Sequence, residues 1–105
     1  MKIGKLIKKV RKARGLSKFD VISAINTNFE EGFGVSIEAY RQFEKGVAIP
    51  TEIVNLISSA LKVPSNVLLS MTLDTNDTTI KSLQKRSKRI LMAVIEANKE
   101  LKIED

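Results

Sequence analysis

The sequence predicts an all-α protein, with five helices in residues 1–70 and one long helix at the C-terminal end. Three observations indicate this class. Apolar residues recur at intervals of three and four along most of the chain, Ser and Gly stand where helices should begin and end, and no convincing strand pattern occurs. With 105 residues, of which 43% are hydrophobic, the chain can bury one modest core.

The first helix is predicted from an apolar stripe near the N-terminus, with cations on the remaining surface. Its stripe residues are Ile3, Leu6, Ile7 and Val10, and Gly15 ends it.

A second helix is predicted directly afterwards. Ser17 can cap its start, and Asp20, three residues on, can complete an approximate capping box. Leu16 and Val21 have the spacing of a hydrophobic staple. The following segment, residues 26–33, is rich in Asn, Thr and Gly and predicts a loop.

The stretch GVSIEAYRQFEKG predicts a short third helix with a clear start and end. Ser36 can cap it, Glu38 lies in the first turn, where the helix dipole favours an anion, and Gly46 suits a left-handed closing position. A helix of about nine residues does not persist alone in water. Tyr40 and Phe43, the large apolar residues of one face, are therefore expected to dock it on the core.

Two further helices and a tail complete the prediction. Thr51 is expected to cap a fourth helix, and Pro64 to open a short fifth one. Residues 71–79 form a predicted linker, and residues 80–105 a long helix. Its apolar residues are Ile80, Leu83, Ile90, Leu91, Val94, Ile95 and Leu101.

The apolar stripe of the tail allows two interpretations. It can pack on the domain of its own chain, or it can pair with a second subunit. A free helix of this hydrophobicity would expose a large patch. We expect pairing, so the seven apolar residues of the tail are the predicted dimer interface, and the basic stretch between Lys81 and Arg89 is expected to be exposed.

The charge of the chain indicates a polyanionic partner. The net charge is +6 and the pI is 9.7, a value typical of nucleic-acid-binding domains. Two segments, residues 1–19 and residues 78–95, contain many cations and no acid. A single basic block can equally be a solvated helix face, so this distribution alone leaves both interpretations open.

Composition argues against several other classes. The chain has no cysteine, so it has no disulfide or thiolate ligand, and no histidine, the commonest general base and metal ligand. No catalytic, metal or cofactor site is expected. The basic N-terminus is unlike a secretory signal, and the longest apolar run, ILMAVI, is too short to span a bilayer. A cytoplasmic protein with no membrane contact is expected.

The stretches RGLSKFDVISAI, GVSIEAYRQFEKGVAIPT and IVNLISSALKVPSNVLL resemble the lambda-repressor and Cro-like (Xre-type) helix-turn-helix family. The resemblance covers most of residues 3–70. It is strongest at Gly15-Leu16-Ser17, Val35-Ser36, Phe43-Glu44-Lys45-Gly46 and Pro50. It implies a five-helix DNA-binding domain in which residues 37–45 form the recognition helix that enters the major groove.

The resemblance also implies a role for particular side chains. Base contacts are expected from Ile37, Glu38, Arg41 and Gln42, and phosphate contacts from Ser17, Lys18, Ser36 and Lys45. Arg11 and Glu44 occupy the positions of an ion pair that ties the first helix to the recognition helix.

One departure from the family concerns residues 26–33. Family members usually join the second and third helices by a tight turn, whereas this chain has an insertion there. Glu30 and Glu31 would repel DNA, so we expect the insertion to fold over the core through Phe29 and Phe33, or to meet a protein.

Together these features predict a sequence-specific transcriptional regulator, a repressor that binds a palindromic operator as a homodimer. The alternative is an antitoxin or protein-interaction module that binds a partner through its C-terminal helix. An RNA-binding role is weaker, because the chain has one tyrosine, four phenylalanines and no aromatic residues interleaved with its cations.

Overall fold

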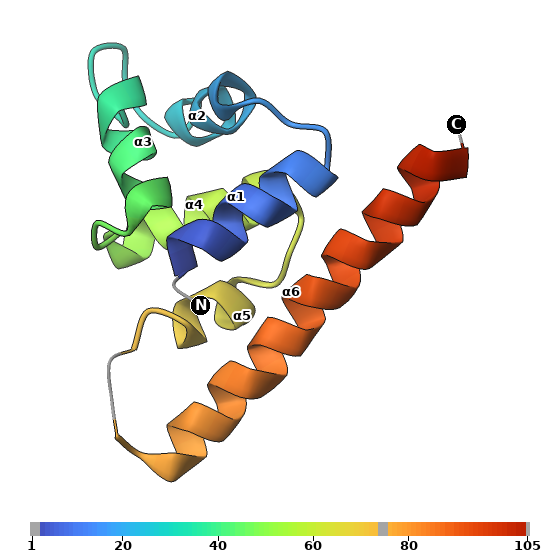
Figure 1. The fold of residues 1–105 in the computed structure, drawn as a ribbon. Coiled ribbons are helices and arrows are strands. Elements are labelled where there is room, and N and C mark those ends of the chain that lie inside the picture. Colours follow the sequence, from blue (N-terminus) through green and yellow to red (C-terminus); the bar gives the residue numbers. More distant parts are fainter. Residues whose placement is uncertain (1–2, 74–75, 105) are drawn as a thin grey trace.

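Six helices follow one another in the computed structural model, which describes residues 3–73 and 76–104, with side chains up to residue 98 (Figure 1). They are α1 (Ile3–Ala13), α2 (Lys18–Asn26), α3 (Ile37–Lys45), α4 (Thr51–Leu61), α5 (Ser65–Ser70) and α6 (Thr78–Glu104). The described residues contain no strand, so the predicted all-α class is confirmed. None of the described helices is both long enough and apolar enough to cross a membrane.

Helix α1 lies at the centre of the arrangement. Leu6, Ile7 and Val10 are fully buried, as the apolar stripe predicts. The helix packs against α3 and against α6, and these two helices lie on opposite sides of it in Figure 1. The exposed side of α1 carries Lys5 and Lys9.

Helix α4 differs from its prediction at its start. Pro50 occupies the cap position, Thr51 is already the first helical residue, and no side chain caps this end. The expectation that Thr51 caps the helix is therefore wrong. The other end is held by Arg14, whose guanidinium donates hydrogen bonds to the carbonyl oxygens of Leu61 at 3.1 Å and Lys62 at 3.2 Å. A cation at the carbonyl end also suits the helix dipole.

Helix α6 packs along its own chain, against α1 and α5. Leu91 and Ile95 belong to the same buried core as the residues of α1. The Ser70 and Ser87 hydroxyl oxygens are 2.6 Å apart, and the Gln84 amide donates to the carbonyl oxygens of Ser70 and Leu73. The tail is thus held by polar contacts as well as by apolar packing.

This packing corrects part of the predicted dimer interface. Leu91 is fully buried and Ile95 is 3% exposed within a single chain, so neither can face a second subunit in this conformation. Leu83 and Ile90 are 46% and 41% exposed, and Ile80 and Val94 are half-buried. The side chain of Leu101 lies outside the described residues. What remains available to a partner is the edge formed by exposed Leu83 and Ile90, with half-buried Ile80 and Val94 beside them.

Candidate nucleic-acid interface

The start of α3 is fixed by a cap and by a contact with the end of α2. The Ser36 hydroxyl oxygen accepts a hydrogen bond from the Ala39 N–H at 3.1 Å, which confirms the predicted cap. Before it, the Asn26 amide and the Val35 backbone exchange two hydrogen bonds of 3.0 and 2.8 Å. Gly34 has a φ of +118°, and a Cβ there would overlap the Asn26 amide oxygen. This contact, which we call the Asn26 clasp, joins the two ends of the predicted insertion.

The insertion itself folds only partly as predicted. The clasp makes residues 26–35 a closed loop, in agreement with the expected absence of helix. Phe29 is half-buried and packs on the core, as expected. Phe33, by contrast, is 71% exposed. The expectation that Phe33 covers the core is wrong. The two hydrogen bonds of the Asn26 clasp close the loop, so the Phe33 side chain is not needed to hold the loop on the core.

The end of α3 uses a glycine. Gly46 has a φ of +117°, and the Val47 N–H reaches back to the Gln42 carbonyl oxygen at 3.0 Å. This is the Schellman arrangement, which satisfies carbonyl groups that the last helical turn leaves without partners.

One face of α3 is buried against the rest of the chain. Tyr40 is fully buried and Phe43 is 9% exposed, so both dock the helix as predicted. The crossing with α1 is close at Gly4, where a Cβ would overlap the Phe43 carbonyl oxygen. Since no larger residue fits there without moving a backbone, the position of α3 on α1 is tightly constrained.

A buried ion pair locks the same crossing. The Arg11 Nε donates to Glu44 Oε2 at 2.8 Å and Nη2 donates to Oε1 at 3.2 Å, a bidentate pair whose side chains are only 7% and 4% exposed. Arg11 Nη1 also donates to the Leu16 carbonyl oxygen at 2.9 Å, in the connection to α2. The pairing expected from the resemblance is therefore present, and it joins α1, α3 and the turn before α2.

The Tyr40 hydroxyl lies beside this pair but makes no hydrogen bond of standard geometry with a described residue. Burial raises the pKa of Tyr40 well above its ordinary value, and the Glu44 carboxylate raises it further. The phenol therefore stays neutral at ordinary pH.

The other face of α3 is open to solvent. The side chains of Glu38, Arg41, Gln42 and Lys45 are exposed, and no hydrogen bond or ion pair engages them among the described residues. Ile37 is half-buried and packs against the core. The predicted base-contacting residues thus share one rigid helix, with Ile37 at the boundary between its buried and exposed sides.

The start of α2 offers fewer hydrogen-bond donors to a phosphate than predicted. The capping box is complete: Asp20 N–H donates to Ser17 Oγ at 3.0 Å, and Ser17 N–H donates to the Asp20 carboxylate at 2.8 Å. The hydrogen bond from the Ser17 backbone lowers the pKa of Asp20, so this carboxylate is ionised at neutral pH. A negative charge already occupies the helix end where a phosphate was expected, which leaves the Ser17 hydroxyl hydrogen and half-buried Lys18 as donors.

Sequence reasoning missed two contacts that position this surface. The Asn26 clasp joins a side chain to the backbone N–H and carbonyl of a residue nine positions on, and the Arg14 contacts join a side chain to carbonyls 47 and 48 positions on. Local sequence patterns do not reveal contacts between a side chain and a non-neighbouring backbone group. No group of acidic residues that could hold a metal ion occurs in the part of the chain that the structure describes.

Comparisons with protein-family models, curated proteins and solved structures found no match.

Proposed function

We propose that the protein is a sequence-specific DNA-binding transcriptional regulator in which α2 and α3 form a helix-turn-helix and α3 enters the major groove. One observation carries the proposal: the exposed face of α3 presents Glu38, Arg41 and Gln42, whose side chains have no hydrogen-bond or ion-pair partner among the residues that the structure describes, on a helix that a buried bidentate ion pair holds in place. A rigid helix with free polar side chains is what direct base readout requires.

The chemistry of the exposed face supports base recognition. Gln can form a bidentate contact with adenine, Arg with guanine, and a carboxylate can accept from cytosine N4. Ser36 and Lys45, at the two ends of α3, suit phosphate contacts, as does Lys18 at the start of α2. These contacts would position the helix, whereas the central side chains would read sequence.

The proposed active species is a homodimer that acts as a repressor in the cytoplasm. One α3 would read only a half-site, and two-fold symmetry would double the contact on a palindromic operator. The apolar edge of α6, formed by exposed Leu83 and Ile90 with half-buried Ile80 and Val94, is the seam we propose in place of the whole tail stripe.

A second candidate function follows from the exposed aromatic residue of the insertion. Phe33 is 71% exposed on a loop closed by the Asn26 clasp, so a protein partner could dock there, as an interaction module or antitoxin would require. In this candidate, DNA binding by α3 would be secondary to binding of the protein partner.

The test begins with selection of binding sites from random duplexes, which should yield a palindromic consensus. On that site, Gln42→Ala should cost about 1 to 3 kcal/mol and relax specificity at one base pair of each half-site. Binding to a scrambled duplex should hardly change.

Lys18→Ala provides the matched comparison. It should weaken cognate and scrambled duplexes alike and reduce the slope of log affinity against log salt by about one unit per subunit. Equal losses on both duplexes for Gln42→Ala, or a selection without any consensus, would contradict base reading by α3.

A further inference from the structure

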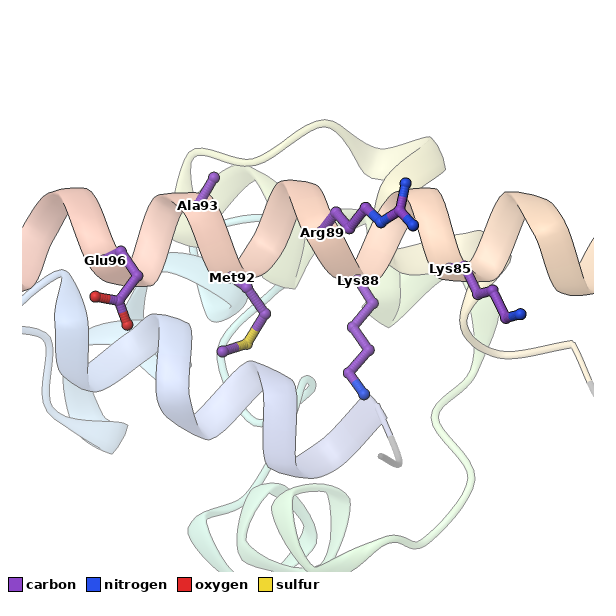
Figure 2. A pocket seen from close by; sticks show the side chains of 6 residues that line it. All are labelled: Lys85, Lys88, Arg89, Met92, Ala93 and Glu96. Carbon is purple, nitrogen blue, oxygen red and sulfur yellow. The ribbon is translucent and has the colours of Figure 1, made fainter.

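A second cationic surface lies along α6. Lys81, Lys85, Lys88 and Arg89 are all exposed, and no ion pair or hydrogen bond engages their side chains in the described part of the chain. We call these four residues the α6 basic edge. Two adjoining shallow grooves follow it, and both are lined by Lys85 and Lys88. Figure 2 shows Lys85, Lys88 and Arg89 next to one another along the helix.

The fold holds this edge in a fixed orientation. On the buried side of α6, Leu91 and Ile95 enter the core, and Ser87 and Gln84 bond to the end of α5 and the segment after it. A helix anchored on that side cannot turn its basic edge inward. The four cations therefore lie on the solvent-exposed side of a helix whose orientation is fixed.

The linear density of charge along the α6 basic edge is similar to that of one nucleic-acid strand. At a rise of 1.5 Å per residue, the helix advances about 12 Å from Lys81 to Arg89, so the four cations have a mean spacing of about 4 Å. One strand of duplex DNA carries a phosphate about every 3.4 Å of the axis. No acid occurs between residues 78 and 95, and the carboxylate that lines one of the two grooves, Glu96, lies seven residues beyond Arg89.

We propose that the α6 basic edge is a second, sequence-independent surface that binds the phosphate backbone of duplex DNA. The edge belongs to α6, which lies on the opposite side of α1 from α3. In this arrangement the edge holds a different duplex segment from the one proposed to lie on α3. Binding by the edge alone does not rest on the proposed role of α3; simultaneous binding of two segments does.

The composition of the edge favours duplex DNA over other polyanions. An amphipathic helix binds a lipid surface by inserting large apolar residues. On α6, Leu91 and Ile95 are buried in the core, and exposed Leu83 and Ile90 belong to the proposed dimer seam. The only apolar residues in the two grooves are Met71, Met92 and Ala93. Single-stranded nucleic acid is bound by stacking on aromatic residues, and α6 contains none. The edge is therefore suited to contacts with the phosphate groups of a duplex, which need neither apolar insertion nor base stacking.

The first experiment measures the affinity of the full chain for a labelled random-sequence duplex at several salt concentrations. The variant K81Q/K85Q/K88Q should reduce the slope of log affinity against log salt by about 2.7, since each phosphate contact contributes about 0.9. At a salt concentration about tenfold below 1 M, this change in slope corresponds to a loss of up to about 500-fold in affinity for the duplex.

Two controls separate the edge from net charge and from folding. K81R/K85R/K88R keeps every charge and should bind as the wild type does. K5Q/K8Q/K9Q removes the same charge from exposed lysines of α1 and should lose much less affinity. Circular dichroism should show the same helix content for all variants. Equal losses for the α6 and α1 variants would overturn the proposal, because net charge alone would explain them.

The second experiment tests simultaneous binding. The protein is first mixed with one equivalent of unlabelled cognate duplex per dimer, which occupies the α3 helices without excess duplex for the sequence-independent edge, and the labelled random duplex is then added. The wild type should still bind it, and K81Q/K85Q/K88Q should not. If site selection yields no consensus, the proposed role of α3 fails, yet the random-duplex titration still decides the role of the edge. Stronger binding to vesicles of equal phosphatidylglycerol and phosphatidylcholine than to the duplex would overturn the assignment to DNA.

Discussion

The ion pair between Arg11 and Glu44 makes a strong quantitative prediction about stability. Glu44→Ala removes both carboxylate oxygens and leaves a guanidinium whose side chain is only 7% exposed, with the Leu16 carbonyl as its remaining partner. Breaking a buried pair in this way costs about 3 to 5 kcal/mol, because the stranded charge has lost its compensation. The free energy of unfolding of a domain of this size is about 5 to 15 kcal/mol, so the variant should lose a large fraction of its stability.

Urea unfolding followed by circular dichroism measures this loss. With a slope of about 1.5 kcal/mol per molar urea, the midpoint of Glu44→Ala should fall by about 2 M or more. Lys45→Ala is the matched control, since it removes a charge from the adjacent, exposed position and should change the free energy of unfolding by less than about 0.5 kcal/mol.

A double substitution tests the cause of the loss. Arg11→Met combined with Glu44→Leu removes both charges and fills the space, so it should recover most of the stability that Glu44→Ala loses. Equal midpoints for Glu44→Ala and Lys45→Ala would refute the reasoning, because they would mean that the pair contributes no more than an exposed one.

The sequence predicts helix ends well where the chemistry is local. The caps by Ser17 and Ser36 and the closing glycine at position 46 depend on residues within a few positions of one another, and the structure confirms all three. Thr51 shows the limit of this reasoning. A capping residue type next to Pro50 can take either position, and the fixed φ of proline places the helix start one residue earlier.

Long-range contacts are where sequence reasoning stops. An apolar stripe on the tail indicates that something covers it, but the same stripe suits a second subunit and the chain's own α1 and α5. The outcome depends on whether the segment after α5 lets α6 fold back, and no local pattern encodes that. The Asn26 clasp is similar, because its partner is the backbone of Val35, which any residue would supply. Of the candidate interface, the Arg11–Glu44 pair was predictable only through the family resemblance.

The capping carboxylate of Asp20 should make stability depend on pH. The pKa of Asp20 is below its ordinary value of 3.8, so the ionised carboxylate stabilises the fold at pH values above 3.8. This contribution disappears as the pH falls through the lowered pKa. The thermal midpoint of Asp20→Ala should therefore lie below that of the wild type at pH 7, and the difference should close in strong acid. The two sides of α6 make the last prediction. Leu91 is fully buried in the core of a single chain, so Leu91→Ala should cost about 3 kcal/mol of unfolding free energy at every protein concentration. Leu83 is 46% exposed, so Leu83→Ala should cost less than about 1 kcal/mol in the monomer but weaken self-association in sedimentation experiments if its edge is the dimer seam. Should Leu91→Ala instead shift the monomer–dimer equilibrium and leave the dilute monomer as stable as before, α6 would be packing against a second subunit, and the fold of the tail on α1 and α5 would have to be abandoned.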